Sequence, residues 1–149
     1  MCVVRVFALA VAAFLLPLAA QQAATYQRAI RLAQQIPVSA LDPDLPDKPL
    51  LPWLAEALGP AAKIEWEVTD CGEQTGNPDL DRGRDFPLCV DAVATWPDGR
   101  MAIVSVVMGS FQKGIDGPPT LWSVSIKNGA RFDTIPKLRD LPARVSRAN

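Results

Sequence analysis

The sequence predicts an α+β domain in which an N-terminal amphipathic helix packs on an antiparallel sheet of four or five strands. Three observations predict it: apolar residues at helical spacing near the N-terminus, alternating apolar and polar residues in later segments, and turn residues between those segments. Sequential strands joined by tight turns form a meander, and one helix can cover one of its faces.

The first 20 residues have the pattern of an export signal. Arg5 precedes an apolar run from 6 to 18, and two alanines then precede Gln21. The run is shorter than the roughly 20 apolar residues of a spanning helix. We therefore expect cleavage near Gln21, with an uncleaved anchor as the alternative. Residues 21–149 then form a single secreted or periplasmic domain that meets the membrane only through its signal peptide, 1–20.

Two helices and a connector are expected next. Between Thr25 and Ile36 the apolar residues fall on one helical face, which predicts a helix capped by Thr25 and packed on the core. Five prolines between 37 and 52 predict a stiff, extended connector. A short helix is expected from Leu50 to Leu58, ended by a glycine.

The remaining chain has the period of strands. Ile64, Trp66 and Val68 alternate with polar residues, which predicts a strand with one buried face. Apolar residues at both parities from 101 to 108 predict a central strand covered on both faces. The sequence Asn128-Gly129 is typical of a two-residue hairpin turn. The strands expected after the first span 88–96, 100–111, 121–127 and 130–135.

Two cysteines would remain after export. Cys2 precedes the apolar run and would be lost with it, whereas Cys71 and Cys89 form an even pair in an oxidising compartment. We expect a structural disulfide between them that closes the 72–88 loop and stabilises the domain by about 3 kcal/mol.

This loop is the predicted contact surface. Long loops on rigid scaffolds often bind partners, and a disulfide at the base lowers the ordering cost of binding. The alternative is that the two cysteines only tie strand ends together. The residues expected to contact a protein or other macromolecular partner are Asp79, Asp81, Arg82, Arg84, Asp85 and Phe86.

A calcium site in the same loop is a second hypothesis. Asn77, Asp79, Asp81 and Asp85 recur at odd positions, as oxygen ligands do in a calcium loop. The match is imperfect, because the glycine comes one place late, Leu88 stands where a glutamate is needed, and two arginines intervene. Pairing of aspartates with these arginines explains the residues without a metal.

Composition excludes several chemistries. The chain has no histidine, which removes serine–histidine and cysteine–histidine nucleophiles and histidine zinc sites. No phosphate-binding glycine loop occurs, no cofactor is implied, and a net charge of -1 gives no support for nucleic-acid binding. An enzyme would depend on carboxylates, so a small hydrolase using Glu65, Glu67, Glu73 and the loop aspartates is a third hypothesis.

Two further features have structural interpretations. We expect Trp53, Trp66, Trp96 and Trp122 in the core, since tryptophan is highly buried on average, although a tryptophan at a domain rim can anchor an interface. The basic C-terminus, with Lys137, Arg139, Arg144 and Arg147, is expected to be a solvated tail.

The order of a helix followed by a meander resembles the cystatin-like group of small secreted folds. The inhibitory loop pattern of cystatins is absent, so the resemblance implies architecture and not protease inhibition. The leading functional prediction is an exported, non-enzymatic binding or accessory domain of the cell envelope or extracellular space that contacts its partner through the 72–88 loop.

Overall fold

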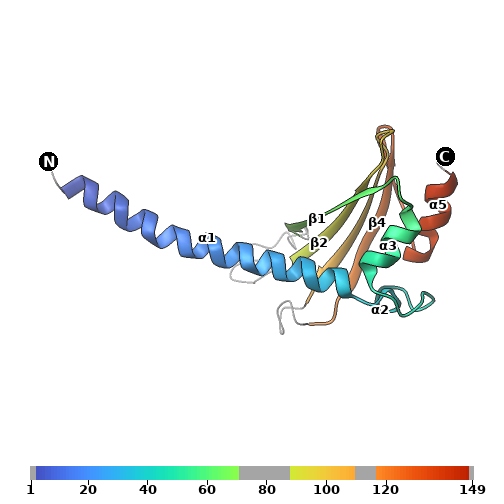
Figure 1. Cartoon of the computed structure of the whole chain (residues 1–149), viewed down its shortest axis with the longest axis horizontal. Coiled ribbons are helices and arrows are strands. Elements are labelled where there is room, and N and C mark those ends of the chain that lie inside the picture. The colour runs from blue at the N-terminus through green and yellow to red at the C-terminus, as the bar shows by residue number, and fades with distance from the viewer. Residues whose placement is uncertain (1–2, 71–87, 110–116, 148–149) are drawn as a thin grey trace, which may run out of the picture.

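The computed structural model describes residues 3–70, 88–109 and 117–147. It confirms the predicted α+β class: helices lie on one face of an open, five-stranded antiparallel sheet with the meander order β1-β2-β3-β4-β5 (Figure 1). The strands are β1 (Lys63–Asp70), β2 (Leu88–Thr95), β3 (Met101–Met108), β4 (Thr120–Asn128) and β5 (Arg131–Thr134).

The first helix is longer than predicted. α1 spans Val3–Gln35, and its N-terminal part reaches away from the sheet (Figure 1). Thr25 is not an N-cap but a mid-helix residue whose hydroxyl donates to the Gln21 carbonyl at 3.0 Å. The helix joins the core only near its end, where Ala29 and Ala33 are buried. The expected packing on the sheet is therefore confirmed for the last two turns.

The proline-rich connector is folded rather than extended. It contains a short helix, α2 (Val38–Leu41), and turns back so that Pro37 and Pro49 form an antiparallel bridge. The Val38 amide donates to the Lys48 carbonyl at 2.8 Å, and the Leu50 amide to the Ile36 carbonyl at 2.8 Å. Burial of the apolar residues between the prolines favours this return, because an extended connector would leave them in water.

The helix after the connector has the predicted bounds. α3 spans Leu50–Leu58 and buries Trp53 and Leu54. Gly59 follows at φ 79, a left-handed conformation that glycine adopts without a steric penalty.

Tight turns set the register of the meander. After β2, the amide of Gly99 donates to the Trp96 carbonyl at 2.9 Å, which pairs Thr95 with Met101. Between β4 and β5 the turn residues are Gly129 and Ala130, because Asn128 already pairs with Arg131. The hairpin turn therefore lies one residue later than the sequence predicts.

The C-terminus is a packed segment and not a solvated tail. A 3-10 turn, η1 (Leu138–Asp140), leads into α5 (Leu141–Arg147), and Leu138, Leu141 and Val145 are buried. The basic residues alternate with these apolar ones. Counting charges alone therefore predicts a solvated tail and does not reveal the buried apolar residues.

The core lies between the helices and one face of the sheet. α1, α3, η1 and α5 all contribute to it. From the sheet, the core receives inward-facing residues of β1 to β4, among them Ile64, Trp66 and Val68 of β1 and Val90, Ala92 and Ala94 of β2, whereas all four residues of β5 are exposed. The alternation predicted for β1 is thus confirmed.

Candidate functional site

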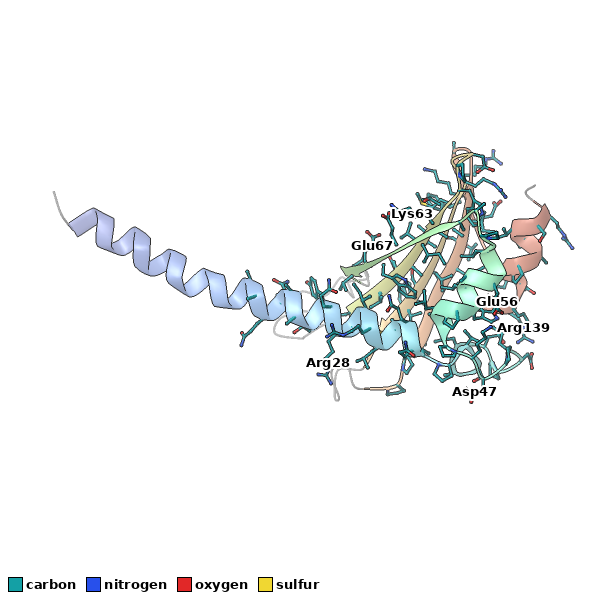
Figure 2. All side chains as sticks on the ribbon, in the orientation of Figure 1. Arg28, Asp47, Glu56, Lys63, Glu67 and Arg139 are labelled. Atoms are coloured by element: carbon teal, nitrogen blue, oxygen red, sulfur yellow. The ribbon has the colours of Figure 1, made fainter. Side chains whose placement is uncertain are left out.

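The helices leave one broad face of the sheet uncovered, which we call the outer face. Residues alternate across a strand, so those between the core positions point away from the helices. Figure 2 shows Lys63 and Glu67 of β1 projecting from the side of the sheet opposite to Glu56 and Arg139, which belong to the helical layer.

Cross-strand pairing orders the outer face into rows that run from β1 toward β5. Each row joins residues that lie opposite one another in register. In order from the Trp96 turn, the rows are Lys63, Thr95, Met101, Lys127 and Phe132; then Glu65, Val93, Ile103, Ser125 and Thr134; then Glu67, Asp91, Ser105 and Ser123; then Thr69, Cys89, Val107 and Thr120.

Two carboxylates face each other in the third row, which we call the acidic row. Glu67 of β1 pairs directly with Asp91 of β2, which places their Cβ atoms about 4.5–5.5 Å apart. Directly opposed like charges destabilise a sheet. No described residue forms an ion pair with either carboxylate, so their repulsion is uncompensated within this part of the molecule.

The Asp91 carboxylate is only partly satisfied. Its Oδ2 accepts a hydrogen bond from the Thr69 hydroxyl at 3.1 Å. Its Oδ1 is buried and, among the described residues, has no hydrogen-bond partner. Leaving a buried polar atom without a partner costs about 1–3 kcal/mol, and native proteins tolerate few such atoms. The arrangement can therefore accept a donor, and a cationic donor best of all.

Apolar side chains flank the acidic row on the two central strands. Val93 and Ile103 pair on one side of it, and Cys89 and Val107 pair on the other. Val93, Ile103 and Val107 are half-buried. The prediction that β3 is covered on both faces is therefore wrong: its inner-parity residues are buried, whereas the apolar ones on the outer face keep part of their surface in solvent.

An exposed tryptophan stands beside this face. The pairing of β3 with β4 shifts between Ser105 and Val106, so that Ser105 pairs with Ser123 and Val106 with Leu121. Trp122 is the extra residue of this bulge and is 52% exposed. The expectation of burial is confirmed for Trp53 and Trp96 and for Trp66, which packs half-buried on the core, but is wrong for Trp122.

A second exposed aromatic occupies the opposite end of the face. Phe132 is 55% exposed, and the Lys127 ammonium lies 5.3 Å from its ring centroid. The other lysine of the outer face, Lys63, forms an ion pair with Glu65 at 2.6 Å. Both cations of the outer face among the described residues are thus engaged in rows other than the acidic one.

Most of the residues predicted from the cysteine-closed loop lie outside the described residues. Cys71 and Glu73 are among them, as are all the expected partner contacts and calcium ligands. These contacts and ligands are Asn77, Asp79, Asp81, Arg82, Arg84, Asp85 and Phe86. Cys89 is described, and it is 2% exposed at the second position of β2. The Cys71–Cys89 disulfide, the calcium site and the loop contacts all stay predictions.

Asp91 was missed as a candidate because the sequence does not pair it with anything. Glu65 and Glu67, which belong to the predicted carboxylate pool, are placed on the outer face, but only the register of β1 with β2 brings Glu67 to Asp91. The available signal was a lone aspartate in an otherwise apolar strand segment.

The described residues contain no group of three or more His, Cys, Asp or Glu side chains arranged to hold a metal ion. In the same part of the chain, no helix has the length and apolarity to cross a membrane.

A comparison with known protein families, characterised proteins and solved structures found no match. The resemblance to cystatin-like folds therefore stays unconfirmed.

Proposed function

We propose that this protein is an exported, non-enzymatic binding module whose contact surface is the outer face of its sheet, extended by the 72–88 loop. The observation that carries the proposal is the outer face itself. It presents the half-buried Ile103 and Val93 on the same sheet as the exposed Trp122, which lies at the β3–β4 bulge next to the partner of Ser105. Apolar and aromatic groups on a rigid scaffold are typical of protein interfaces.

The dimensions of the face support a protein partner. The four long strands have eight or nine residues each. With strands about 4.8 Å apart and about 3.4 Å of rise per residue, they present roughly 500 Å². A standard interface takes about 800 Å² from each partner, so the sheet supplies the larger part of such a contact and needs an extension.

The 72–88 loop is connected at a position that suits this extension. Asp70 and Leu88, from which it departs and to which it returns, pair at one end of β1 and β2. That end adjoins the row of Thr69 and Cys89 on the outer face. A Cys71–Cys89 disulfide would hold the base of the loop next to the proposed contact surface.

Export is supported by the N-terminal pattern and by the helix that carries it. Between 19 and 28 the side chains of α1 are exposed except for the half-buried Tyr26, and the first core residue is Ala29. Cleavage near Gln21 would therefore remove no described core contact. We place the mature protein in the periplasm or outside the cell.

A carboxylate-dependent hydrolase is the competing function, and the Glu67–Asp91 pair favours it. Paired carboxylates can supply the acid and the nucleophile of sugar cleavage when a cleft holds the substrate between them. This pair instead stands on one face of a sheet, between apolar rows, which favours binding over catalysis.

Affinity capture with the exported, oxidised protein tests the proposal. The test variant combines Val93→Thr, Ile103→Thr and Trp122→Thr, which lowers apolarity while keeping β-branched residues in the strands. The matched control is Leu32→Ala, an exposed apolar residue of α1 at 37% exposure. Circular dichroism first establishes that both variants fold as the parent does.

We expect an envelope protein to be captured by the parent and by the control but not by the outer-face variant. Alanine replacement of Arg82, Arg84 and Phe86 should weaken capture further if the loop contributes. Capture that is unchanged by the outer-face variant would contradict the proposal. Turnover of a glycan or ester substrate that is lost with Asp91→Asn would favour the hydrolase.

A further inference from the structure

We infer that the partner segment is an extended strand that places an arginine or lysine on the acidic row and an apolar side chain on each side of that cation. The inference rests on the proposed function, since it names the chemistry of what the outer face binds. It is carried by the charge of the acidic row and by the spacing of the rows around it.

Charge gives the first argument. Glu67 and Asp91 face each other across β1 and β2, with no ion-pair partner among the described residues. The nearest lysines are already engaged, Lys63 by Glu65 and Lys127 by the Phe132 ring. A guanidinium or ammonium group from outside would relieve the repulsion between the two carboxylates and fit the charge of the row.

The unsatisfied oxygen of Asp91 gives the second argument. Thr69 satisfies Oδ2 of Asp91, whereas Oδ1 is buried and without a donor among the described residues. Ser105, which pairs with Asp91 on β3, is also buried at 7% exposure. Asp91 as a whole is half-buried and Glu67 is exposed, so the acidic row is in contact with solvent where a cation would approach.

Row spacing gives the third argument and sets the sequence pattern. Along β2 and β3, the apolar pair Val93 and Ile103, the acidic row, and the half-buried Val107 succeed one another every second residue. Cys89, which pairs with Val107, is 2% exposed and offers no contact surface. Each step is about 6.8 Å, which is also the separation of side chains on one face of an extended strand. A strand aligned with β2 therefore matches the face with the pattern apolar-x-cation-x-apolar, where x is any residue.

Three synthetic peptides test this inference by NMR titration of the exported, oxidised protein. The probe is acetyl-Thr-Leu-Thr-Arg-Thr-Leu-Thr-amide. One control replaces the arginine with glutamine, and the other, acetyl-Thr-Leu-Arg-Thr-Thr-Leu-Thr-amide, moves the arginine to the opposite face of the strand. We expect saturable shifts at the amides of Asp91, Ser105 and Ile103 with the probe, and an affinity at least about ten-fold lower for both controls.

Variants of the protein complete the test. Asp91→Asn and Glu67→Gln should each weaken probe binding by about ten-fold, and raising the salt concentration should weaken it in the parent. Glu56→Gln, on the helical side of the molecule, should leave it unchanged.

Two outcomes would overturn the inference and leave the proposed function to its own test. The first is equal binding of the arginine and glutamine peptides; the second is no binding of any peptide at millimolar concentration. If affinity capture still depends on Val93, Ile103 and Trp122, the outer face remains the contact surface and only the cation is wrong.

Discussion

Arg139 donates three hydrogen bonds to the buried carboxylate of Asp42, which lies 97 residues earlier in the sequence. Its Nη2 donates to Oδ1 at 2.6 Å, its Nε to Oδ2 at 3.0 Å, and its backbone amide to Oδ2 at 3.1 Å. Asp42 is 4% exposed, and it follows α2 in the connector, whereas Arg139 lies in η1. The pair therefore links the connector to the C-terminal segment.

Replacing Asp42 with asparagine should destabilise the domain by roughly 2 kcal/mol. Arginine carries donors only, so the new amide NH₂ would face another donor and one hydrogen bond would be lost. Urea unfolding measures the change. Asp98→Asn is the matched control, since Asp98 also pairs with an arginine but its side chain is 53% exposed. Equal losses in the two variants would contradict a special role for Asp42.

Stability should fall in acid through the same contact. Burial raises the pKa of Asp42, but the hydrogen bonds and the charge of Arg139 outweigh it and hold the pKa below its ordinary value of 3.8. A lowered pKa in the folded state stabilises the protein above the unfolded pKa, and this contribution is lost as the pH falls through the folded pKa.

The measurement is Tm against pH for the parent and for Asp42→Asn. We expect a constant difference between pH 7 and pH 5, which then narrows below about pH 4 as the carboxylate of the parent becomes protonated. A difference that stayed constant down to pH 2 would show that ionisation of Asp42 does not matter. Asp98 contributes in the same direction, because the backbone amide of Arg100, followed by its side chain, lowers the pKa of Asp98.

Local sequence patterns predicted most helices and strands of this fold, but they could not predict contacts between residues far apart in the sequence. The alternation from Ile64 to Val68 and the glycine after Leu58 are local signals, and both predicted the structure correctly. The Asp42–Arg139 pair has no local signal, because nothing in either segment specifies the other. The same is true of the C-terminal helix, whose apolar residues are too few for a clear period.

The candidate site, too, could be predicted from the sequence only where a short turn fixes the pairing of its residues. The turn at 97–99 fixes the register of β2 with β3, so the pairing of Asp91 with Ser105 follows from local sequence. The long loop between β1 and β2 leaves their register free, and the Glu67–Asp91 pair could not be predicted. Trp122 was predicted to be buried from the average burial of tryptophan, and the bulge that leaves it exposed has no signal in the sequence.

Two tryptophans should respond oppositely to alanine substitution. Trp53 is 7% exposed in α3, so its removal leaves a cavity and should cost about 3–5 kcal/mol. Trp122 is 52% exposed, and its removal should cost less than about 1 kcal/mol while abolishing partner capture. Chemical unfolding and affinity capture on both variants check this. A large stability loss for Trp122→Ala would assign that residue to the core.

The projecting part of α1 should be dispensable for folding. A chain that begins at Gln21 keeps both Ala29 and Ala33, and its free energy of unfolding should match that of the full chain within about 1 kcal/mol. A chain that begins at Leu32 loses Ala29 and shortens the helix below a stable length, which should cost roughly 2 kcal/mol or more. Equal stability of the two shortened chains would show that the end of α1 adds little to the core.

Replacing Asp91 with threonine should stabilise the domain and remove its binding function. The substitution deletes the buried oxygen that lacks a partner and the charge that opposes Glu67, while a β-branched residue suits the strand and its hydroxyl can still meet Thr69. We expect a gain of about 0.5–2 kcal/mol in urea unfolding together with loss of partner capture. Val93→Thr, its neighbour on the same face, is the control and should give no gain. If Asp91→Thr were instead destabilising, the carboxylate would be structural. If Asp91→Thr gains stability and loses partner capture, Asp91 belongs to the interface. The native carboxylate then destabilises the domain, and binding explains why the protein has it.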